Sequence, residues 1–292
     1  MVYFTFQSLL KHDAMIDLIA PGAEVRKLAG GFQFTEGPAC DSAGNVYFSD
    51  QPNDRIMKWS IAGMLETFMQ PSGRANGMCF DEEDKLWTCS DEKNEIWRID
   101  ASGRKEVMVG GYDGRLLNGP NDLWIRPDGG VYFTDPFYER DYWNRGPMEQ
   151  DGEHVYYLSP DRTRLTRVAE DLKKPNGIIG TPDGKLLYVA DIGAGRTFRY
   201  LIQADGKLKG KRLVCELGSD GMTIDNLGNI YLTEYAVTVV DPFGHTIARI
   251  EMPESGWVGN VCFGGPDRRT LFITASKNLW GLDMAVHGAG SQ

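Results

Sequence analysis

Residues 176–191 read NGIIGTPDGKLLYVAD, and the pattern of this stretch decides the fold because it recurs along the chain. A polar residue and a Gly lead into a short apolar run, a turn with Asp and Gly follows, and a second apolar run ends in a polar residue. Short apolar runs joined by a Gly-containing turn are typical of paired β-strands. The stretch therefore predicts a β-hairpin.

Five other segments share this pattern. They are EGPACDSAGNVYFSD (36–50), NGMCFDEEDKLWTCS (76–90), NDLWIRPDGGVYFTD (121–135), DGMTIDNLGNIYLTE (220–234) and NVCFGGPDRRTLFITA (260–275). The six units start 40, 45, 55, 44 and 40 residues apart. Such regular spacing indicates a repeat architecture.

Each unit continues into a third alternating run, such as IWRID (96–100), and often a fourth, such as KEVMV (105–109). Four short strands at a period of about 40–45 residues are typical of a propeller blade. The sequence predicts an all-β protein, a six-bladed β-propeller with four-stranded blades. EVRKLAG (24–30) is expected to supply the outer strand of the last blade and so close the ring.

The repeats predict one domain over residues 24–284, with an N-terminal extension over 1–23 and a C-terminal tail over 285–292. The alternative is a pair of β-sandwiches. It would require a change of composition near the middle of the chain, and the repeats run through that point without one. Blades that each cover the apolar face of the next favour a single closed ring.

The balance of 31 Lys and Arg against 41 Asp and Glu gives a net charge of −10, which disfavours nucleic acid and anionic membranes as partners. No apolar run approaches the ~18 residues of a membrane span, and the N-terminus lacks the features of a signal peptide. The five cysteines lack metal-ligand spacing and are expected to be buried thiols. We expect a cytoplasmic protein, or a periplasmic one if a signal peptide has been removed; its oligomeric state stays open.

The first residue of every repeat carries a side-chain oxygen. These residues are Glu36, Asn76, Asn121, Asn176, Asp220 and Asn260. Because the innermost strand of each blade lines the channel, they should form a ring at one mouth. Carboxylate and amide oxygens suit Ca²⁺ or Mg²⁺, and the absence of His and Cys from the ring disfavours zinc and copper. The alternative is that each residue only caps the turn into its strand.

Several motifs carry a family resemblance. FTEGPACD, LNGPNDLWIRPDGGVYFTDP, KKPNGIIGTPDGKLLYVAD, SDGMTIDNLGNIYLTE and FGGPDRRTLFITA resemble the senescence marker protein / gluconolactonase / luciferin-regenerating enzyme family, most closely its bacterial gluconolactonase-like branch. The resemblance covers roughly residues 24–284. It implies a six-bladed propeller with one divalent ion, usually calcium, near the channel mouth; Mg²⁺ or another divalent ion is the alternative.

The resemblance also implies roles for four of the ring residues. Glu36, Asn176 and Asp220 match the family's ligands of the ion, and Asn121 matches a fourth oxygen donor that also approaches the substrate. Asp220 further matches the residue proposed as general acid/base or nucleophile. The resemblance assigns no role to Asn76 or Asn260.

The chain departs from the family pattern at two places. Some relatives hold a second, structural calcium with a His and an Asp, where this chain has Cys262 and Thr223, so a second ion is not expected. Animal sugar lactonases place an Arg two residues before the Asn of the PND motif, where this chain has Gly119. Arg74 is the candidate substitute for the substrate contacts of that Arg, and a surface arginine is the alternative.

Other candidate substrate contacts lie on either side of the third repeat. Asn118 precedes the PND motif and is expected to face the mouth, and Asp135 either binds a substrate hydroxyl or has a structural role. The extra length of the third step falls in 135–154, where Tyr138 is a candidate contact. This segment is either a lid over a sugar ring or a long hairpin whose aromatic residues pack on the adjacent blade.

Together these features predict a divalent-metal-dependent hydrolase that opens a small sugar lactone, similar to gluconolactone, to the aldonic acid. The metal would polarise the carbonyl and Asp220 would act as general acid/base. The partner is then a small-molecule lactone. The alternatives are phosphotriester hydrolysis at the same site and a noncatalytic, metal-stabilised propeller that serves as a binding module.

Overall fold

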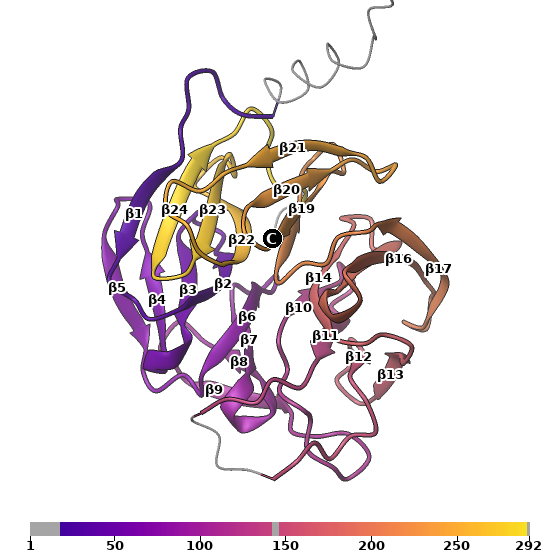
Figure 1. The fold of residues 1–292 in the computed structure, drawn as a ribbon. Coiled ribbons are helices and arrows are strands. Elements are labelled where there is room, and N and C mark those ends of the chain that lie inside the picture. Colours follow the sequence, from indigo (N-terminus) through magenta and orange to yellow (C-terminus); the bar gives the residue numbers. More distant parts are fainter. Residues whose placement is uncertain (1–17, 142–145, 291–292) are drawn as a thin grey trace, which may run out of the picture.

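A computed structural model describes residues 18–141 and 146–290. Its strands form six antiparallel sheets of four strands each, which stand around a central axis as a six-bladed propeller (Figure 1). The predicted fold class is therefore confirmed.

The strands follow the repeats in chain order. Blade 1 contains β2 (Thr35–Cys40), β3 (Val46–Asp50), β4 (Arg55–Trp59) and β5 (Leu65–Met69), and blade 2 contains β6 (Ala75–Phe80), β7 (Leu86–Ser90), β8 (Glu95–Ile99) and β9 (Lys105–Val109). Blade 3 contains β10 (Leu123–Ile125), β11 (Val131–Asp135), β12 (His154–Leu158) and β13 (Leu165–Ala169), and blade 4 contains β14 (Pro175–Gly180), β15 (Leu186–Asp191), β16 (Arg196–Ile202) and β17 (Leu208–Cys215). Blade 5 contains β18 (Met222–Ile224), β19 (Ile230–Thr233), β20 (Val237–Val240) and β21 (Thr246–Ile250), and blade 6 contains β22 (Val258–Gly264), β23 (Thr270–Ala275), β24 (Asn278–Asp283) and β1 (Arg26–Gly30).

The ring is closed by the strand predicted for this purpose. β1 pairs antiparallel with β24 as the outermost strand of blade 6, and Lys27 lies opposite Trp280. The first described strand of the chain and the last thus share one sheet, so backbone hydrogen bonds hold the two ends of the propeller together.

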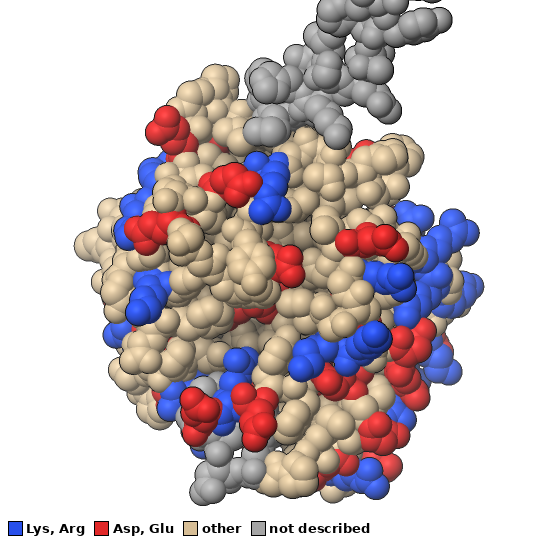
Figure 2. All heavy atoms as spheres, viewed as in Figure 1, with Lys and Arg blue, Asp and Glu red and all other residues tan. Residues whose placement is uncertain are grey.

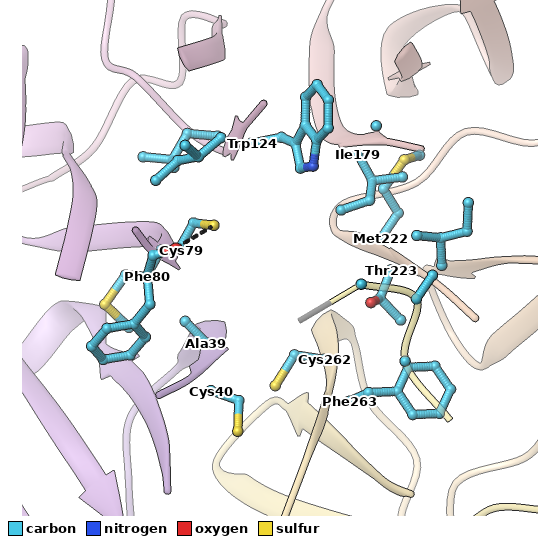
Figure 3. A pocket seen from close by; sticks show the side chains of 18 of the residues that line it. Ala39, Cys40, Cys79, Phe80, Trp124, Ile179, Met222, Thr223, Cys262 and Phe263 are labelled. Carbon is cyan, nitrogen blue, oxygen red and sulfur yellow. Dashed lines mark hydrogen bonds between the residues drawn. The ribbon is translucent and has the colours of Figure 1, made fainter. Parts of the chain in front are cut away.

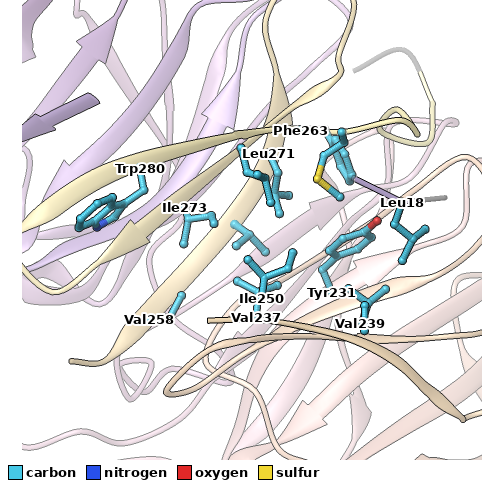
Figure 4. Close-up of a cluster of buried hydrophobic side chains, with 14 of the residues drawn as sticks. Leu18, Tyr231, Val237, Val239, Ile250, Val258, Phe263, Leu271, Ile273 and Trp280 are labelled. Carbon is cyan, nitrogen blue, oxygen red and sulfur yellow. The ribbon is translucent and has the colours of Figure 1, made fainter. Parts of the chain in front are cut away.

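The core consists of apolar side chains packed between neighbouring blades. Between blades 5 and 6, Tyr231, Val237 and Ile250 face Leu271 and Ile273, and all five are buried (Figure 4). Each of these side chains comes from a strand whose alternate residues point to opposite faces of its sheet. Stacked sheets of this kind remove apolar surface from water only when the neighbouring blade is present, which makes the six blades one cooperative unit.

The segments next to the predicted domain limits also pack on the propeller. Leu18 belongs to the core between blades 5 and 6 and is 3% exposed. Its carbonyl oxygen accepts a hydrogen bond of 2.8 Å from the backbone N–H of Ala285. Gly288 forms an isolated bridge with Asp225. Residues 18–23 and 285–290, predicted from the sequence to be part of an extension and of a tail, therefore contact the propeller.

Helical structure in residues 18–141 and 146–290 is limited to three short 3-10 turns, η1 (Gln51–Asn53), η2 (Asp91–Lys93) and η3 (Ile192–Ala194). None of these could cross a bilayer.

Candidate active site

The ring residues lie where the innermost strands begin. In four blades the pairing of the inner strand with its neighbour shifts register at or beside the ring residue, between Glu36 and Ala39, Ala75 and Met78, Pro175 and Ile178, and Val258 and Asn260. An irregularity of this kind redirects a side chain that would otherwise point to one face of the sheet. Acidic atoms lie in the hollow at the centre of the face seen in Figure 2.

The structure brings Asp220 together with both Glu36 and Asn176. Nδ2 of Asn176 donates a hydrogen bond of 2.7 Å to Oδ1 of Asp220. The carboxyl groups of Glu36 and Asp220 lie within hydrogen-bonding reach of each other. Three of the four predicted metal-binding side chains, from blades 1, 4 and 5, thus meet at the axis.

Adjacent ring positions pack closely because small residues separate them. A Cβ on Gly221 would lie 1.9 Å from Cγ of Asn260, and a Cβ on Gly259 would lie 2.7 Å from Oε1 of Glu36. Asn121 is 5% exposed, and its carbonyl oxygen accepts a hydrogen bond of 2.7 Å from the N–H of Gly77 in the preceding blade. These contacts join neighbouring blades at the level of the ring.

The two ring carboxyl groups are held in an unfavourable environment for negative charge. Burial raises the pKa of Glu36 well above its usual range, and the nearby Asp220 carboxylate raises it further. Burial also raises the pKa of Asp220, against the opposing effects of hydrogen bonds from Trp257 and Asn176 and of the Arg140 charge. Two adjacent acidic groups with raised pKa values resist being ionised at the same time. A bound cation would offset the repulsion between the two carboxylates.

The side-chain oxygens of the ring fit a hard divalent cation. Oδ1 of Asn176 is buried, its residue is only 1% exposed, and no residue that the structure describes donates a hydrogen bond to this oxygen. A buried acceptor without a donor is costly, and a cation would satisfy it. In residues 18–141 and 146–290 no three His, Cys, Asp or Glu side chains are grouped to hold a metal by themselves. Amide oxygens would therefore have to complete the ligand set.

The structure also places Tyr138 at the ring. Its hydroxyl oxygen accepts a hydrogen bond of 2.9 Å from Nδ2 of Asn176. The guanidinium carbon of Arg140 lies 4.9 Å from the centre of the Tyr138 ring, and Nε of Arg140 lies 3.5 Å from Oδ2 of Asp91 at the start of η2. The segment after β11 thus sends an aromatic and a cationic side chain to the mouth.

Asn118 and Asp135 shape the backbone around the mouth. Asp135 is fully buried, and its carboxylate accepts hydrogen bonds of 2.9 Å from the backbone N–H groups of Asn118 and Gly119. Asp50 and Asp191, at the same place in blades 1 and 4, likewise accept backbone N–H groups of the loop that precedes their inner strand. Of the two roles predicted for Asp135, these contacts favour the structural one, in which its carboxylate holds the loop before β10.

The carboxamide of Asn118 joins the two ends of the 135–154 segment. Its Nδ2 donates to the carbonyl oxygens of Asp135, at 3.0 Å, and Gly152, at 2.9 Å. Residues 142–145, which include two of the aromatic residues of the 135–154 segment, Tyr142 and Trp143, lie outside the described residues.

Arg74 is engaged with the neighbouring blade. Its Nη1 donates to the carbonyl oxygen of Gln51 at 3.4 Å and to that of Pro52, both in η1 of blade 1. Its own backbone N–H donates to Oδ1 of Asp54 at 2.7 Å. In this arrangement Arg74 links the loop before β6 to blade 1.

Two residues of the site were not identified from the sequence. Nε1 of Trp257 donates a hydrogen bond of 2.5 Å to Oδ2 of Asp220. Asp122 is 5% exposed beside the ring, and burial raises its pKa to about 8. Asp122 had a signal, because four other repeats have Gly at this position. Trp257 precedes its repeat and had none.

Below the ring the channel contains a cavity of about 450 Å³. Its lining comes from the inner strands, the turns that follow them and residues 288–290, and includes the side chains of Cys40, Cys79, Cys262, Met222 and Thr223 (Figure 3). Cys262 and Thr223, where relatives would place a His and an Asp, thus do face the channel. The ring forms one end of this space.

Residues 34–277 match the family described as SMP-30/Gluconolactonase/LRE-like region. The chain belongs to this family. It is similar to the gluconolactonase of Zymomonas mobilis, with 30% identity over 91% of this chain and 82% of that protein.

Solved structures within the SMP-30/gluconolactonase family share the fold described above. A putative gluconolactonase superimposes with a TM-score of 0.88 at 35% identity, covering 94% of this chain and 97% of the other. A gluconolactonase from Xanthomonas campestris superimposes with a TM-score of 0.86 at 29% identity, covering 93% of each chain.

Proposed function

We propose that the protein is a divalent-metal-dependent lactonase that hydrolyses a small sugar lactone, similar to gluconolactone, to the aldonic acid. The observation that carries the proposal is the meeting of Glu36 and Asp220 with the unpartnered Oδ1 of Asn176 at the channel mouth. Membership of the SMP-30/gluconolactonase family and the names of the relatives support the choice of substrate class.

Glu36, Asn121, Asn176 and Asp220 would hold the ion, and Ca²⁺ suits their oxygen donors best. When bound, the ion supplies a Lewis acid that polarises the lactone carbonyl and stabilises the charge that develops on its oxygen. A bound ion would also account for the two buried carboxyl groups that lie side by side, because its positive charge offsets their repulsion.

In this proposal Asp220 moves the proton. Its carboxylate accepts a proton from the attacking water as the new C–O bond forms, and returns it to the ring oxygen as the acyl C–O bond breaks. Hydrogen bonds from Asn176 and Trp257 fix the two carboxylate oxygens in place. Tyr138, anchored to Asn176, borders the space in which the substrate would lie.

The test measures hydrolysis of glucono-δ-lactone and of paraoxon by the wild type, with and without EDTA, and by Asp220→Asn and Glu36→Gln. We expect EDTA-sensitive lactone hydrolysis that Asp220→Asn lowers by about 10²- to 10⁴-fold, while circular dichroism shows a folded protein. Preference for paraoxon would replace the lactone with a phosphotriester. Lactone turnover unchanged in Asp220→Asn would refute the assigned role.

A further inference from the structure

Two aromatic side chains outside the predicted site contact each other, and one of them contacts Asp220. Trp257 directly precedes β22, and its indole N–H points at Oδ2 of Asp220. Tyr235 lies in the loop between β19 and β20, and its ring centre is 5.1 Å from that of Trp257 at an interplanar angle of 81°. The two rings therefore form an edge-to-face pair at the mouth.

The backbone around Trp257 is held firmly. Its carbonyl oxygen accepts hydrogen bonds from Ser276, one of 2.8 Å from the backbone N–H and one of 3.1 Å from Oγ. The N–H of the next residue, Val258, donates a hydrogen bond of 2.7 Å to the carbonyl oxygen of Glu234. β19 and β22 lie side by side near the axis (Figure 1). The backbone of Trp257 is thus held by blades 5 and 6, and the indole is oriented by its contacts with Asp220 and Tyr235, as a group that positions another must be.

Tyr235 is exposed to an unusual degree for an aromatic residue. It is 66% exposed, whereas most of the tyrosines of the propeller are buried in the cores between blades. Its edge-to-face contact with Trp257 leaves much of its surface open at the mouth. An exposed aromatic surface next to convergent polar groups is typical of a ligand site.

The polar groups at the mouth select the kind of ligand. Glu36 and Asp220 would balance the charge of a bound divalent ion, and that ion would draw an oxygen atom of the ligand toward the axis. A neutral sugar lactone has an oxygen-bearing edge that suits the ring and a face of C–H groups that suits an aromatic surface. The Tyr235–Trp257 pair offers such an aromatic surface, and Trp257 contacts the carboxylate of Asp220, which would act on the lactone carbonyl.

We infer that Tyr235 and Trp257 form an aromatic subsite that packs against the C–H face of a neutral sugar lactone, and that Trp257 is also a positioning residue for Asp220. The inference rests on the proposed function for the identity of the ligand. Tyr235 contributes binding alone. The Trp257 N–H fixes the orientation of the carboxylate and so contributes to the chemical step.

The experiment compares three variants with the wild type in lactone hydrolysis. Tyr235→Ala should raise KM about 5- to 10-fold with kcat within about twofold. Trp257→Phe keeps an aromatic ring but removes the N–H, and should lower kcat about 10- to 100-fold with KM within about threefold. Phe243→Ala is the matched control, because Phe243 is 85% exposed in the turn between β20 and β21, across β20 from Tyr235. It should change neither constant.

Unchanged KM in Tyr235→Ala, or unchanged kcat in Trp257→Phe, would overturn the corresponding part of the inference. Calorimetry of the binding of 1,5-anhydro-D-glucitol, a neutral sugar ring that cannot be hydrolysed, in the presence of CaCl₂ separates this failure from that of the proposed function. If the wild type hydrolyses no lactone, the proposed function fails. The subsite then stands only if the neutral ring binds and Tyr235→Ala, but not Phe243→Ala, weakens this binding; equal binding or none would overturn it.

Discussion

Replacing Gly259 with Ala tests the packing of the ring at one atom. The new Cβ would lie 2.7 Å from Oε1 of Glu36, whereas ordinary contact begins at 3.4 Å. The Glu36 carboxylate must therefore retreat by roughly 0.7 Å. Oxygen ligands of Ca²⁺ occupy a window of about 2.3–2.6 Å from the ion, so a displacement of this size removes Glu36 from the ligand set.

We expect Gly259→Ala to lower calcium affinity at least about tenfold, an effect of about 1.4 kcal/mol. The backbone needs to adjust little, since the nearest main-chain atom is the Thr35 oxygen at 3.0 Å from the new Cβ. The free energy of unfolding without calcium should therefore fall by only about 1–2 kcal/mol.

Calorimetric titration with CaCl₂ measures the first quantity, and urea unfolding in EDTA measures the second. Gly110→Ala is the control, because its Cβ would meet only Val107 Cγ1, at 3.9 Å. Wild-type calcium affinity in Gly259→Ala would refute the placement of Glu36 among the ligands.

Three further predictions concern the rest of the molecule. Asp135→Ala should lower the free energy of unfolding by about 2–4 kcal/mol, because it leaves buried backbone N–H groups without acceptors; a substrate-contact role would instead raise KM at wild-type stability. Leu18→Ala should cost about 2–4 kcal/mol in urea unfolding because Leu18 is 3% exposed in a core, and an unchanged midpoint would show that residues 18–23 are dispensable. Burial raises the pKa of Cys40 to about 11 and that of Cys79 to about 12, so iodoacetamide at pH 8 should alkylate both at least about 100-fold more slowly than free cysteine, and faster as pH rises; labelling of the folded protein at the free-cysteine rate would contradict this burial.

The propeller and its ring could be predicted from the sequence because both follow from the repeat. Each repeat pairs two apolar runs through a turn, so the strands and their order are local consequences of the pattern. Glu36, Asn176 and Asp220 share one position of the repeat, and symmetry about the axis then brings them together. Asp122 was also within reach, since it stands where most repeats have Gly.

The remaining features depend on contacts that no repeat encodes. The backbone of Trp257 is held by hydrogen bonds from Ser276 and by the bond from Val258 to Glu234, and its indole meets Asp220 and Tyr235 from another blade. The sequence left Asp135 with two possible roles, and its complete burial under the loop before β10, which favours the structural one, is a tertiary contact that the repeat does not reveal. Leu18 packs between blades 5 and 6, against residues more than 200 positions later in the sequence, so the repeat pattern around Leu18 does not predict this contact.

A crystal structure of the protein grown with CaCl₂, with the ion identified by its anomalous signal, tests the central claim most directly. The account predicts one calcium ion at the channel mouth, with side-chain oxygens of Glu36, Asn121, Asn176 and Asp220 at about 2.3–2.6 Å. Only water at this position under saturating calcium, or an ion bound without Asp220, would contradict it.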